Sequence, residues 1–380
     1  MNILQVCLYY PPSTGGVENF VKELNNNIIF LKPSVHITVL CFRRSKNEKE
    51  DSFLNGVRVI RIDPFLVLSS QPIAFFLKRK IKNILNETTF DIINFHYPNP
   101  LMSNALLKAY SEINCKAELF VHWHGDIVGR KLLTFWYTNS TNRLLRACSH
   151  ITSDTKNYAL HSKLLVKFID KVTTIPAIPD YSILNEAHKD LKIEKYIDKL
   201  ADGRKIVFSF GRMVKWKGFQ YLIESFKKLK QEEYILFLGG YGKYEKTLRK
   251  MAAGQENIFF IGKVNETTKY TFLKKADLFV FPSIGRQEAF GICLAEAMYC
   301  GTLCLTFDYE DLGAREIAIP DVSCISAKPR NIEDLARQIK RCCEMENTEK
   351  ESITNTAKKI IGEKLSLDFY RQQIINTYFE

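Results

Sequence analysis

Residues 283–304 read SIGRQEAFGICLAEAMYCGTLC, and this stretch contains an unusually placed carboxylate, Glu296. Glu296 is the only charged residue between Ala289 and Phe307, in an apolar run that predicts a helix buried on all sides. A buried carboxylate is strongly disfavoured without a partner, and no Lys or Arg lies one helical turn away. We therefore expect its partner to come from elsewhere in the fold or from a ligand.

The same stretch offers a place for an anion. Seven residues separate Glu288 from Glu296, and between them the backbone N–H groups of Phe290, Gly291 and Ile292 would open the helix. A helix start of this kind binds anions such as a diphosphate. The two carboxylates can accept hydrogen bonds from hydroxyl groups. The stretch therefore fits a nucleotide-sugar, which has phosphates in the middle and hydroxylated rings at both ends.

The composition is that of a globular chain with room for two domains. It has 380 residues, of which 46% are hydrophobic and 25% charged. There is no run of eighteen apolar residues, and Met1–Val6 reads as a core strand rather than a signal peptide, which predicts a cytoplasmic protein. The formal net charge of +12 suits a nucleic acid, an anionic membrane or a phosphorylated ligand and does not choose among them.

The ten cysteines are expected to be buried reduced thiols. They are scattered, mostly within apolar runs, and form no C-x-x-C pair. Cys300 and Cys304 have no nearby histidine that would complete a zinc site.

Predicted strands and helices alternate along the chain, which is typical of doubly wound α/β domains with parallel sheets. The expected strands are 2–9, 35–41, 57–62, 91–95, 117–123, 150–152, 171–175, 205–210, 234–238, 258–261, 278–281, 303–306 and 324–325. Expected helices of the first half include 17–30, 73–85 and 100–110. We place a domain boundary at the proline-containing stretch 175–180. Ligands of open parallel sheets lie beyond the carboxyl ends of the strands, so we expect the substrates between the two domains.

Three loops that follow predicted strands carry glycines or cations. Gly15 and Gly16 would let the backbone approach a ligand closely, although a plain tight turn explains them equally well and the G-x-G-x-x-G fingerprint is absent. Arg212 and Lys217 could bind phosphate oxygens, and the alternative is a solvated basic loop. Gly240 ends the next strand, where it would either line a ligand or make a turn.

Two motifs raise the question of a metal. His122 and His124 share one face of a strand end, but zinc would need a third ligand that the sequence does not identify, so we favour a polar group facing the cleft. Residues 308–311, Asp-Tyr-Glu-Asp, resemble the D-x-D motif that holds a metal on diphosphate in another transferase fold. Their position in a turn late in the chain favours an acidic loop.

Residues 73–85 mix large apolar and basic side chains. The pattern predicts that Ile73–Leu85 forms a basic amphipathic helix that lies on an anionic membrane surface. The alternative is a domain helix that packs on its sheet and leaves its charges in solvent. The two interpretations do not exclude each other.

Together these residues resemble the retaining glycosyltransferases of glycosyltransferase family 4, which have the GT-B fold. The likeness runs from Gln5 to Leu365–Tyr378 and depends most on E-x7-E at Glu288 and Glu296, followed by GRMVKWKG at 211–218 and GGVE at 15–18. The resemblance implies two Rossmann-like α/β domains facing across a cleft. Residues 1–180 would bind the acceptor and 181–364 the nucleotide-sugar, with a C-terminal helix of about 365–380 crossing back.

The resemblance also implies a role for each candidate residue. Glu288 would contact the transferred sugar, His124 would lie near that sugar, and Glu296 would bind the ribose hydroxyls. The diphosphate would be held by N–H groups and cations, namely those of Phe290, Gly291, Ile292, Arg212 and Lys217. Gly16 would lie close to the phosphates, and Gly15 and Gly240, predicted from their own loops, would complete the donor site.

The implied activity is retaining transfer of a hexose from a UDP- or GDP-sugar to a lipid-linked or lipopolysaccharide oligosaccharide. The stretch HWHGDIV, 122–128, resembles a bacterial subgroup that builds surface polysaccharides and includes mannosyltransferases. We expect no metal, because two cations of the protein would neutralise the diphosphate. We also expect no cofactor and no nucleic-acid partner. The protein is expected at the inner face of the plasma membrane. Two alternatives stay open. One is a GT-B-type nucleotide-sugar epimerase, which needs no acceptor, and the other is a non-catalytic nucleotide-binding subunit of a polysaccharide assembly complex.

Overall fold

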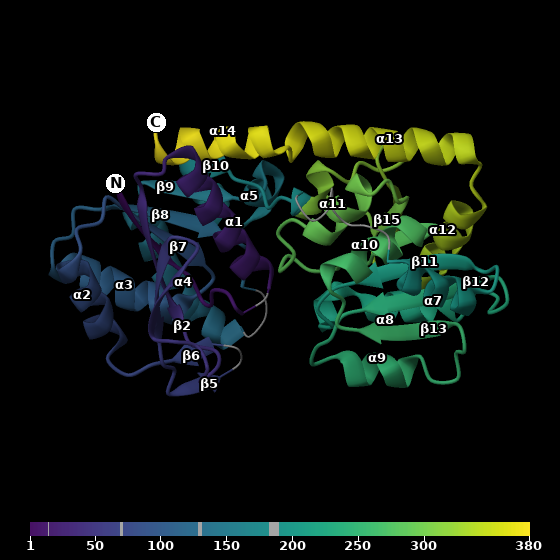
Figure 1. Ribbon diagram of the computed structural model, residues 1–380, viewed down its shortest axis with the longest axis horizontal. Coiled ribbons are helices and arrows are strands. Elements are labelled where there is room, and N and C mark those ends of the chain that lie inside the picture. Colours follow the sequence, from purple (N-terminus) through teal and green to yellow (C-terminus); the bar gives the residue numbers. More distant parts are fainter. Residues whose placement is uncertain (14, 69–70, 128–130, 182–189) are drawn as a thin grey trace. The chain divides into compact units, whose positions relative to one another are not determined.

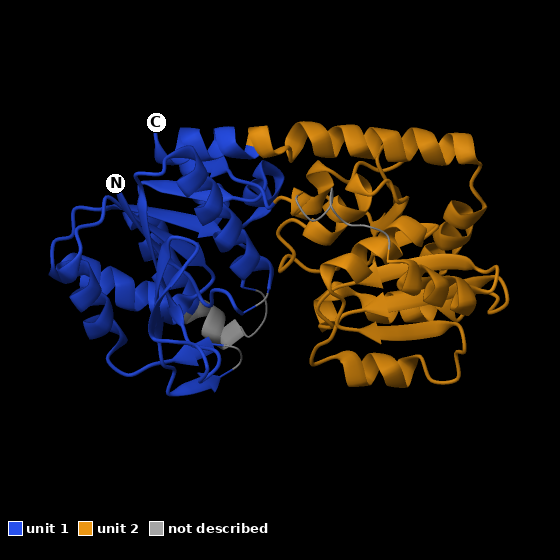
Figure 2. Ribbon diagram, viewed as in Figure 1, with its two compact units in different colours: residues 1–177, 370–380 blue, residues 178–369 orange. Residues whose placement is uncertain are grey.

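A computed structural model describes residues 1–13, 15–68, 71–127, 131–181 and 190–380. The chain forms two compact units (Figure 2). Unit 1 comprises Met1–Ala177 and Tyr370–Glu380, and unit 2 comprises Ile178–Phe369. The chain changes unit after Ala177, whereas the sequence predicted a boundary at residue 180. It returns to unit 1 at Tyr370, whereas the sequence predicted a returning helix from about residue 365.

Unit 1 is built on an eight-stranded sheet with the order β10-β9-β8-β7-β1-β2-β4-β3. Figure 1 labels β2, β7, β8, β9 and β10 of this sheet. Its strands are β1 (Asn2–Val6), β2 (His36–Phe42), β3 (Asp51–Leu54), β4 (Val57–Ile62), β7 (Ile92–Tyr97), β8 (Glu118–Trp123), β9 (His150–Ser153) and β10 (Val172–Thr174). All neighbours pair in parallel except β3 and β4, which form an antiparallel hairpin. The central strand β7 is buried at every position, as expected for a parallel sheet covered by helices on both faces.

The helices of unit 1 include α1 (Gly16–Leu31), α2 (Leu77–Glu87), α3 (Pro100–Glu112), α4 (Lys131–Ala147), α5 (Lys156–His161) and most of α14 (Leu367–Tyr378). The helix expected at 73–85 is wrong in its first turn. Ile73 ends a short strand, β6 (Gln71–Ile73), that pairs antiparallel with β5 (Leu66–Leu68). Phe76 has a φ of 55°, and this left-handed backbone separates the hairpin from α2.

Unit 2 contains a six-stranded parallel sheet with the order β13-β12-β11-β14-β15-β16. Its strands are β11 (Lys205–Phe210), β12 (Tyr234–Gly239), β13 (Ile258–Gly262), β14 (Leu278–Phe281), β15 (Cys304–Phe307) and β16 (Ile325–Ala327). The helices include α7 (Leu191–Ala201), α8 (Phe219–Phe226), α9 (Glu245–Met251), α10 (Glu266–Lys275), α11 (Ile292–Tyr299), α12 (Ile332–Glu344) and α13 (Asn347–Lys364). Both units therefore have the doubly wound α/β architecture that the alternating pattern predicts.

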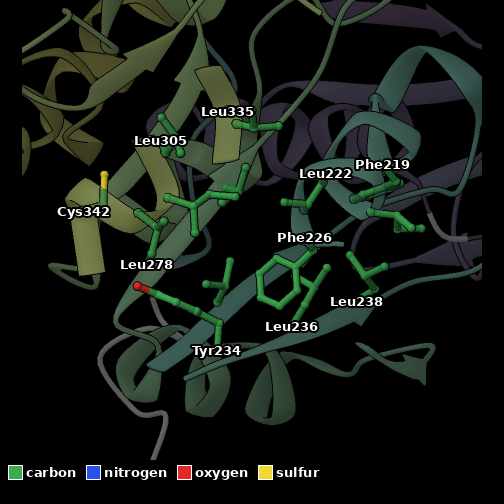
Figure 3. Packing of buried hydrophobic residues seen from close by; sticks show 14 of the residues in the cluster. Phe219, Leu222, Phe226, Tyr234, Leu236, Leu238, Leu278, Leu305, Leu335 and Cys342 are labelled. Atoms are coloured by element: carbon green, nitrogen blue, oxygen red, sulfur yellow. The ribbon is translucent and has the colours of Figure 1, made fainter. Parts of the chain in front are cut away.

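The core of unit 2 lies between the sheet and its helices (Figure 3). Leu236 of β12 and Leu278 of β14 belong to this core, together with Phe219 and Phe226 of α8 and Leu335 of α12. All five are at most 1% exposed. This packing holds the strand ends, and the loops that follow them, in fixed positions.

The composition led to two expectations, one about the cysteines and one about membrane-spanning helices. All ten cysteines are free; Cys115 and Cys300 are half-buried and the others are buried. Among the described residues, no helix combines the length and the apolar composition that crossing a membrane would require.

Candidate active site

The predicted donor residues meet at one edge of the unit 2 sheet. After β11 the chain proceeds outward to β12 and β13 on one side, whereas β14, β15 and β16 lie on the other side. The loops after β11 and β14 therefore diverge, and this topological switch point is where doubly wound sheets bind ligands. Arg212 and Lys217 lie in the loop after β11, Gly240 follows β12, and Glu288 lies in the loop after β14.

Two glycines let these loops pack backbone against backbone. Gly218 has a φ of 74°, and a Cβ added there would lie 1.7 Å from the carbonyl oxygen of Pro282. A Cβ added to Gly240 would lie 2.0 Å from the carbonyl oxygen of Gly211. The N–H of Gly211 donates to the carbonyl of Gly239 at 3.1 Å and that of Met213 to the carbonyl of Tyr241 at 2.9 Å, so the chain on either side of Gly240 positions the loop that holds Arg212.

Lys217 and Glu288 form an ion pair between these loops. Ser283 Oγ donates a hydrogen bond to the same carboxylate oxygen, Oε2, at 3.1 Å. Burial acts to lower the pKa of Lys217, but the Glu288 carboxylate outweighs that effect, so the pKa is raised above its ordinary value. Lys217 therefore stays charged, and most of its charge is balanced by Glu288.

Arg212 is an exposed cation at the same strand end. Its guanidinium lies 5.8 Å from the ring centroid of Trp216, within the range of a cation–π contact. Within the described ranges, no carboxylate pairs with it. Arg212 is thus available to bind an anion.

The start of α11, like Arg212, is available to bind an anion. Its N-cap, Gly291, has a φ of 91° and provides no side chain to cap the helix, and a Cβ there would lie 2.8 Å from Phe281 Cζ. Among the described residues, nothing accepts a hydrogen bond from the N–H groups of Phe290, Gly291 or Ile292. The free N–H groups and the helix dipole make this end attractive to negative charge.

Glu296 does find its partner elsewhere in the fold, in Lys269 of α10. The Nζ of Lys269 donates to Glu296 Oε1 at 2.6 Å, and the hydroxyl of Tyr270 lies 3.4 Å from the same oxygen. Burial raises the pKa of Glu296, and the ammonium group opposes that rise. Among the described residues, no hydrogen bond reaches Oε2, which leaves this oxygen for a ligand.

Sequence reasoning missed Lys269, although a signal for it was present. Lys269 precedes Phe272 and Leu273 by three and four residues, so it lies on the apolar face of α10. It is 6% exposed, and it also pairs with Glu266 at 2.5 Å. A lysine on a buried face implies a buried carboxylate partner.

In unit 1, the loop after β1 places Gly15 and Gly16 at the start of α1. A Cβ on Gly15 would lie 2.3 Å from Oε2 at the end of the flexible Glu18 side chain, which could move aside, so this contact does not by itself require a glycine. A Cβ on Gly16 would meet nothing within 4 Å. Packing within the chain therefore leaves room for a ligand to approach Gly16.

His124 is half-buried and forms a histidine cluster with the buried His96 and His122. Its Nε2 lies 3.0 Å from Nδ1 of His96, and the ring centroids of His122 and His124 are 4.4 Å apart. Burial lowers the pKa of all three imidazoles, that of His122 to about 3. The three rings are therefore neutral near neutral pH.

The structure also supplies the third ligand that the sequence did not identify. His122, His124 and Asp154 each offer a ligand atom within 4.8 Å of the others. His122 Nε2 and Asp154 Oδ1 are 3.9 Å apart, which is wider than the roughly 3.4 Å between neighbouring ligands of a tetrahedral zinc ion. These side chains would have to move closer together to share one ion.

The acidic stretch 308–311 follows β15 as a loop, and its aspartates face arginines. Arg315 donates to Asp308 Oδ1 at 2.8 Å. Arg286 lies 3.5 Å from Asp311 Oδ2. These carboxylates already have cationic partners.

Comparison with known proteins identifies the fold first. The chain superposes on sucrose-phosphate synthase from Thermosynechococcus elongatus with a TM-score of 0.78, over 99% of this chain and 98% of that one, at 14% identity. That likeness establishes the GT-B fold of two Rossmann-like units.

The sequence comparisons identify the family. Residues 14–177 match the model "Glycosyltransferase Family 4", and residues 192–359 match "Glycosyl transferases group 1". The O-antigen chain mannosyltransferase C of Escherichia coli is 28% identical over 78% of this chain and 76% of its own length. The D-rhamnosyltransferase WbpZ of Pseudomonas aeruginosa is 26% identical over 77% and 73%. The chain belongs to the family 4-like glycosyltransferases with the GT-B fold, which confirms the resemblance seen in its motifs.

Proposed function

We propose that this glycosyltransferase moves a hexose from a UDP- or GDP-sugar to a lipid-linked or lipopolysaccharide oligosaccharide, with retention of configuration and without a metal. The observation that carries the proposal is the meeting of Arg212, Lys217 and the open start of α11 at the switch point of unit 2. The two relatives are named for mannosyl and rhamnosyl transfer and for an O-antigen chain, which supports a hexose-type sugar and a surface-polysaccharide acceptor.

The chemistry follows from where charge develops. The nucleoside diphosphate gains negative charge as its bond to the sugar breaks. Arg212 and the N–H groups at the start of α11 stabilise that charge, in the manner of an oxyanion hole. Because Glu288 already balances Lys217, we assign most of the uncompensated positive charge to Arg212. With this charge supplied by the chain, a divalent ion is not needed.

The two carboxylates, Glu296 and Glu288, have different roles in the proposed reaction. Glu296 binds the ribose hydroxyls through Oε2, and Lys269 favours the ionised form, which only accepts hydrogen bonds. Glu288 contacts the transferred sugar and is held in place by Lys217 and Ser283. The resemblance of the motifs assigns His124 of unit 1 to the same sugar.

Retention follows from attack on the face that the diphosphate leaves. The departing diphosphate accepts the proton of the attacking hydroxyl, so the acceptor is deprotonated as the new bond forms. Glycosidases use two carboxylates across the bond because their leaving group needs a proton. A nucleoside diphosphate leaves as a stable anion, so a second carboxylate across the bond is not required.

The apolar surface of unit 1 supports a peripheral membrane contact. The exposed residues Phe65, Leu66, Val67 and Leu68 of the β5–β6 hairpin adjoin the exposed Phe75 and Phe76. The rings of Phe65 and Phe75 are 4.3 Å apart. We define these six residues as the hairpin patch.

The basic helix α2, next to the hairpin patch, offers a membrane surface positive charge and no apolar face. The apolar residues of α2, among them Ile81 and Leu85, are buried in unit 1. Lys78 and Lys82 pair with Glu112 of α3, whereas Arg79 and Lys80 are exposed. We therefore propose that the hairpin patch enters the lipid surface while exposed basic residues of α2 face anionic headgroups.

The experiment that tests the proposed function is a transfer assay. The purified protein is incubated with UDP-glucose or GDP-mannose, with and without a lipid-linked oligosaccharide, and both nucleotide release and acceptor mass are measured. The proposal predicts nucleotide release that depends on the acceptor, together with an acceptor extended by one hexose. Sugar conversion without an acceptor would identify the epimerase, and binding without turnover would identify the non-catalytic subunit.

A further inference from the structure

A pocket of about 400 Å³ opens at the edge of the unit 1 sheet where its parallel strands end. The loop after β1 lines it with Pro11 and Pro12, and the loop after β2 lines it with residues 47–49. Residues 52–54 of β3 and Arg61, near the end of β4, complete the wall. Ligand sites have volumes of this size, and open parallel sheets bind ligands at this edge. We call this cavity the Arg61 pocket.

The buried side chain of Arg61 links the segments that line the pocket. Its Nη2 donates to the carbonyl of Pro11 at 2.8 Å. Its Nη1 donates to the carbonyl of Lys49 at 3.2 Å and to Ser52 Oγ at 2.8 Å. One guanidinium therefore joins the loop after β1, the loop after β2 and strand β3. The fold itself thus builds the pocket.

Glu48 balances the charge of Arg61 in the wall of the pocket. The two side chains are 6% and 4% exposed, and Glu48 Oε2 lies 3.5 Å from Arg61 Nε. A buried pair that is neutral as a whole does not favour a phosphate, and its polarity disfavours a fatty acyl chain. Lys49, the other cation of the lining, is exposed to solvent. The pocket therefore fits an uncharged ligand with polar groups.

Two residues of β3 supply the contacts that a sugar ring requires. Phe53 is 76% exposed and lines the pocket, so its ring is available to pack against the C–H face of a sugar. Ser52 Oγ accepts a proton from Arg61, which can only donate, so the hydroxyl proton of Ser52 remains to be donated. Among the described residues, nothing accepts that proton. An oxygen of a bound sugar would accept it.

The strand order separates the Arg61 pocket from the histidine cluster. His124 follows β8, and Arg61 lies near the end of β4. Between them the sheet runs β8-β7-β1-β2-β4, which is four strand spacings. Neighbouring strands lie about 4.8 Å apart, so the two places are separated by roughly 20 Å. One sugar ring cannot reach both, whereas an oligosaccharide can.

We propose that the Arg61 pocket is a subsite for an internal sugar ring of the acceptor, at a distance from the ring that receives the new sugar. Phe53 packs against the face of that internal ring, and Ser52 donates a hydrogen bond to it. The inference rests on the proposed function for the acceptor, which is an oligosaccharide there. Its consequence is that the protein selects acceptors by length.

The first test measures binding without catalysis. Oligomers of mannose, glucose and galactose, from one ring to five, are titrated calorimetrically into the wild type and Phe53→Ala. The wild type should bind the longer oligomers of at least one sugar. Phe53→Ala should weaken that binding by about five- to tenfold, the scale of losing one aromatic contact. No saturable binding of any oligomer by the wild type, or equal binding by Phe53→Ala, overturns the proposal.

A control and a second variant separate the pocket from general effects on the protein. Phe30→Ala removes a ring that is 63% exposed on α1 and does not line the pocket, so it should leave binding unchanged. Ser52→Ala removes the free hydroxyl and should weaken binding by about two- to tenfold. Thermal unfolding checks that each variant is folded. Equal losses in Phe30→Ala and Phe53→Ala would contradict the subsite.

Kinetics then separate the subsite from the proposed function. With octyl glycosides of the same oligomers as acceptors, the wild-type KM should fall at the chain length that reaches the pocket. In Phe53→Ala that fall should disappear, while the KM values for the one-ring acceptor and the nucleotide donor stay unchanged. A KM that rises equally for acceptors of every length would contradict the subsite.

The two proposals fail in different ways. Oligomers that bind the wild type and depend on Phe53, without any transfer, would contradict the proposed function alone. Transfer whose acceptor KM does not depend on Phe53 at any chain length would contradict the subsite alone.

Discussion

Two lysines hold the two candidate carboxylates of unit 2, and each pair joins different elements. Lys217 meets Glu288 across the loops after β11 and β14, and Lys269 of α10 meets Glu296 of α11. Glu288 balances the charge of Lys217, whereas Lys269 faces two carboxylates, Glu296 and Glu266. A diphosphate approaching this edge therefore encounters Arg212 as the cation without a carboxylate partner among the described residues.

Replacing Arg212 with alanine should lower kcat/KM by roughly 10²–10³-fold, the scale of losing one donor to the developing charge. Steady-state transfer kinetics measure the effect. Lys215→Ala is the matched control, because Lys215 is an exposed cation of the same loop. Equal effects of the two variants would mean that the loop acts only through its overall charge.

Replacing Lys269 with methionine should lower the free energy of unfolding by about 3–5 kcal/mol, because it leaves a buried carboxylate without its cation. Denaturant titration measures the loss. Lys250→Met removes an exposed lysine from α9 and should change stability little. If Lys269→Met is as stable as Lys250→Met, the pair with Glu296 does not stabilise the fold.

The sequence pointed to Arg212, Lys217 and Glu288 because they follow apolar strands, and to Glu296 because it is the only charged residue of an apolar helix. It did not reveal that Lys217 and Glu288 bind each other, since they are far apart in the chain and meet only when β11 and β14 lie side by side. The same holds for Asp154, which joins His122 and His124 through the pairing of β8 and β9.

The loops at the switch point are held by backbone contacts more than by side chains. Gly218 lies against Pro282, and the N–H of Ile284 donates to the carbonyl of Trp216 at 2.9 Å. These contacts tie the loop that carries Arg212 and Lys217 to the loop that carries Glu288. The site therefore depends on residues that have no polar side chain.

Replacing Gly218 with alanine should lower both stability and nucleotide binding, because the new Cβ would overlap the carbonyl of Pro282. Gly203→Ala is the control: its φ of 81° matches the 74° of Gly218, but nothing lies within 4 Å of the added Cβ. Both variants bear the backbone strain of a positive φ, and only Gly218→Ala adds the clash. Thermal unfolding and nucleotide titration measure the difference, and equal losses would contradict the role of the contact.

Among the elements, β11 and β14 have the bounds that the sequence predicts, because their apolar runs end at Gly211 and Pro282. The β5–β6 hairpin was missed because the apolar end of β6 runs through Ala74, Phe75 and Phe76 directly into α2. A continuous apolar run does not distinguish a strand from a helix. The left-handed backbone of Phe76, which separates them, has no signal in the sequence.

Across the whole chain, the two units have different surfaces. Unit 2 carries its candidate chemistry at a strand-end edge, and unit 1 carries both the histidine cluster and the hairpin patch. The formal net charge of +12 left the choice of an anionic partner open. The proposed function assigns that charge two partners, a diphosphate and an anionic lipid surface.

Replacing Phe65 and Phe75 together with serine should weaken binding to vesicles containing phosphatidylglycerol by at least about tenfold, since burying one such ring contributes roughly 1.5–3 kcal/mol. Co-sedimentation measures the partitioning. Phe53→Ser is the control, because Phe53 is 76% exposed on β3 and lies outside the hairpin patch. Unchanged partitioning of the double variant would remove the hairpin patch from the membrane contact.

The proposed function depends on unit 2, which would neutralise a nucleoside diphosphate with its own cations and helix start. Calorimetric titration of UDP and of GDP into the wild type and Arg212→Ala, in excess EDTA, tests it most directly. One of the two nucleotides should bind the wild type saturably, with an affinity that added manganese leaves unchanged and that Arg212→Ala strongly weakens. Binding that requires manganese, or binding that is equally tight in Arg212→Ala, would contradict it.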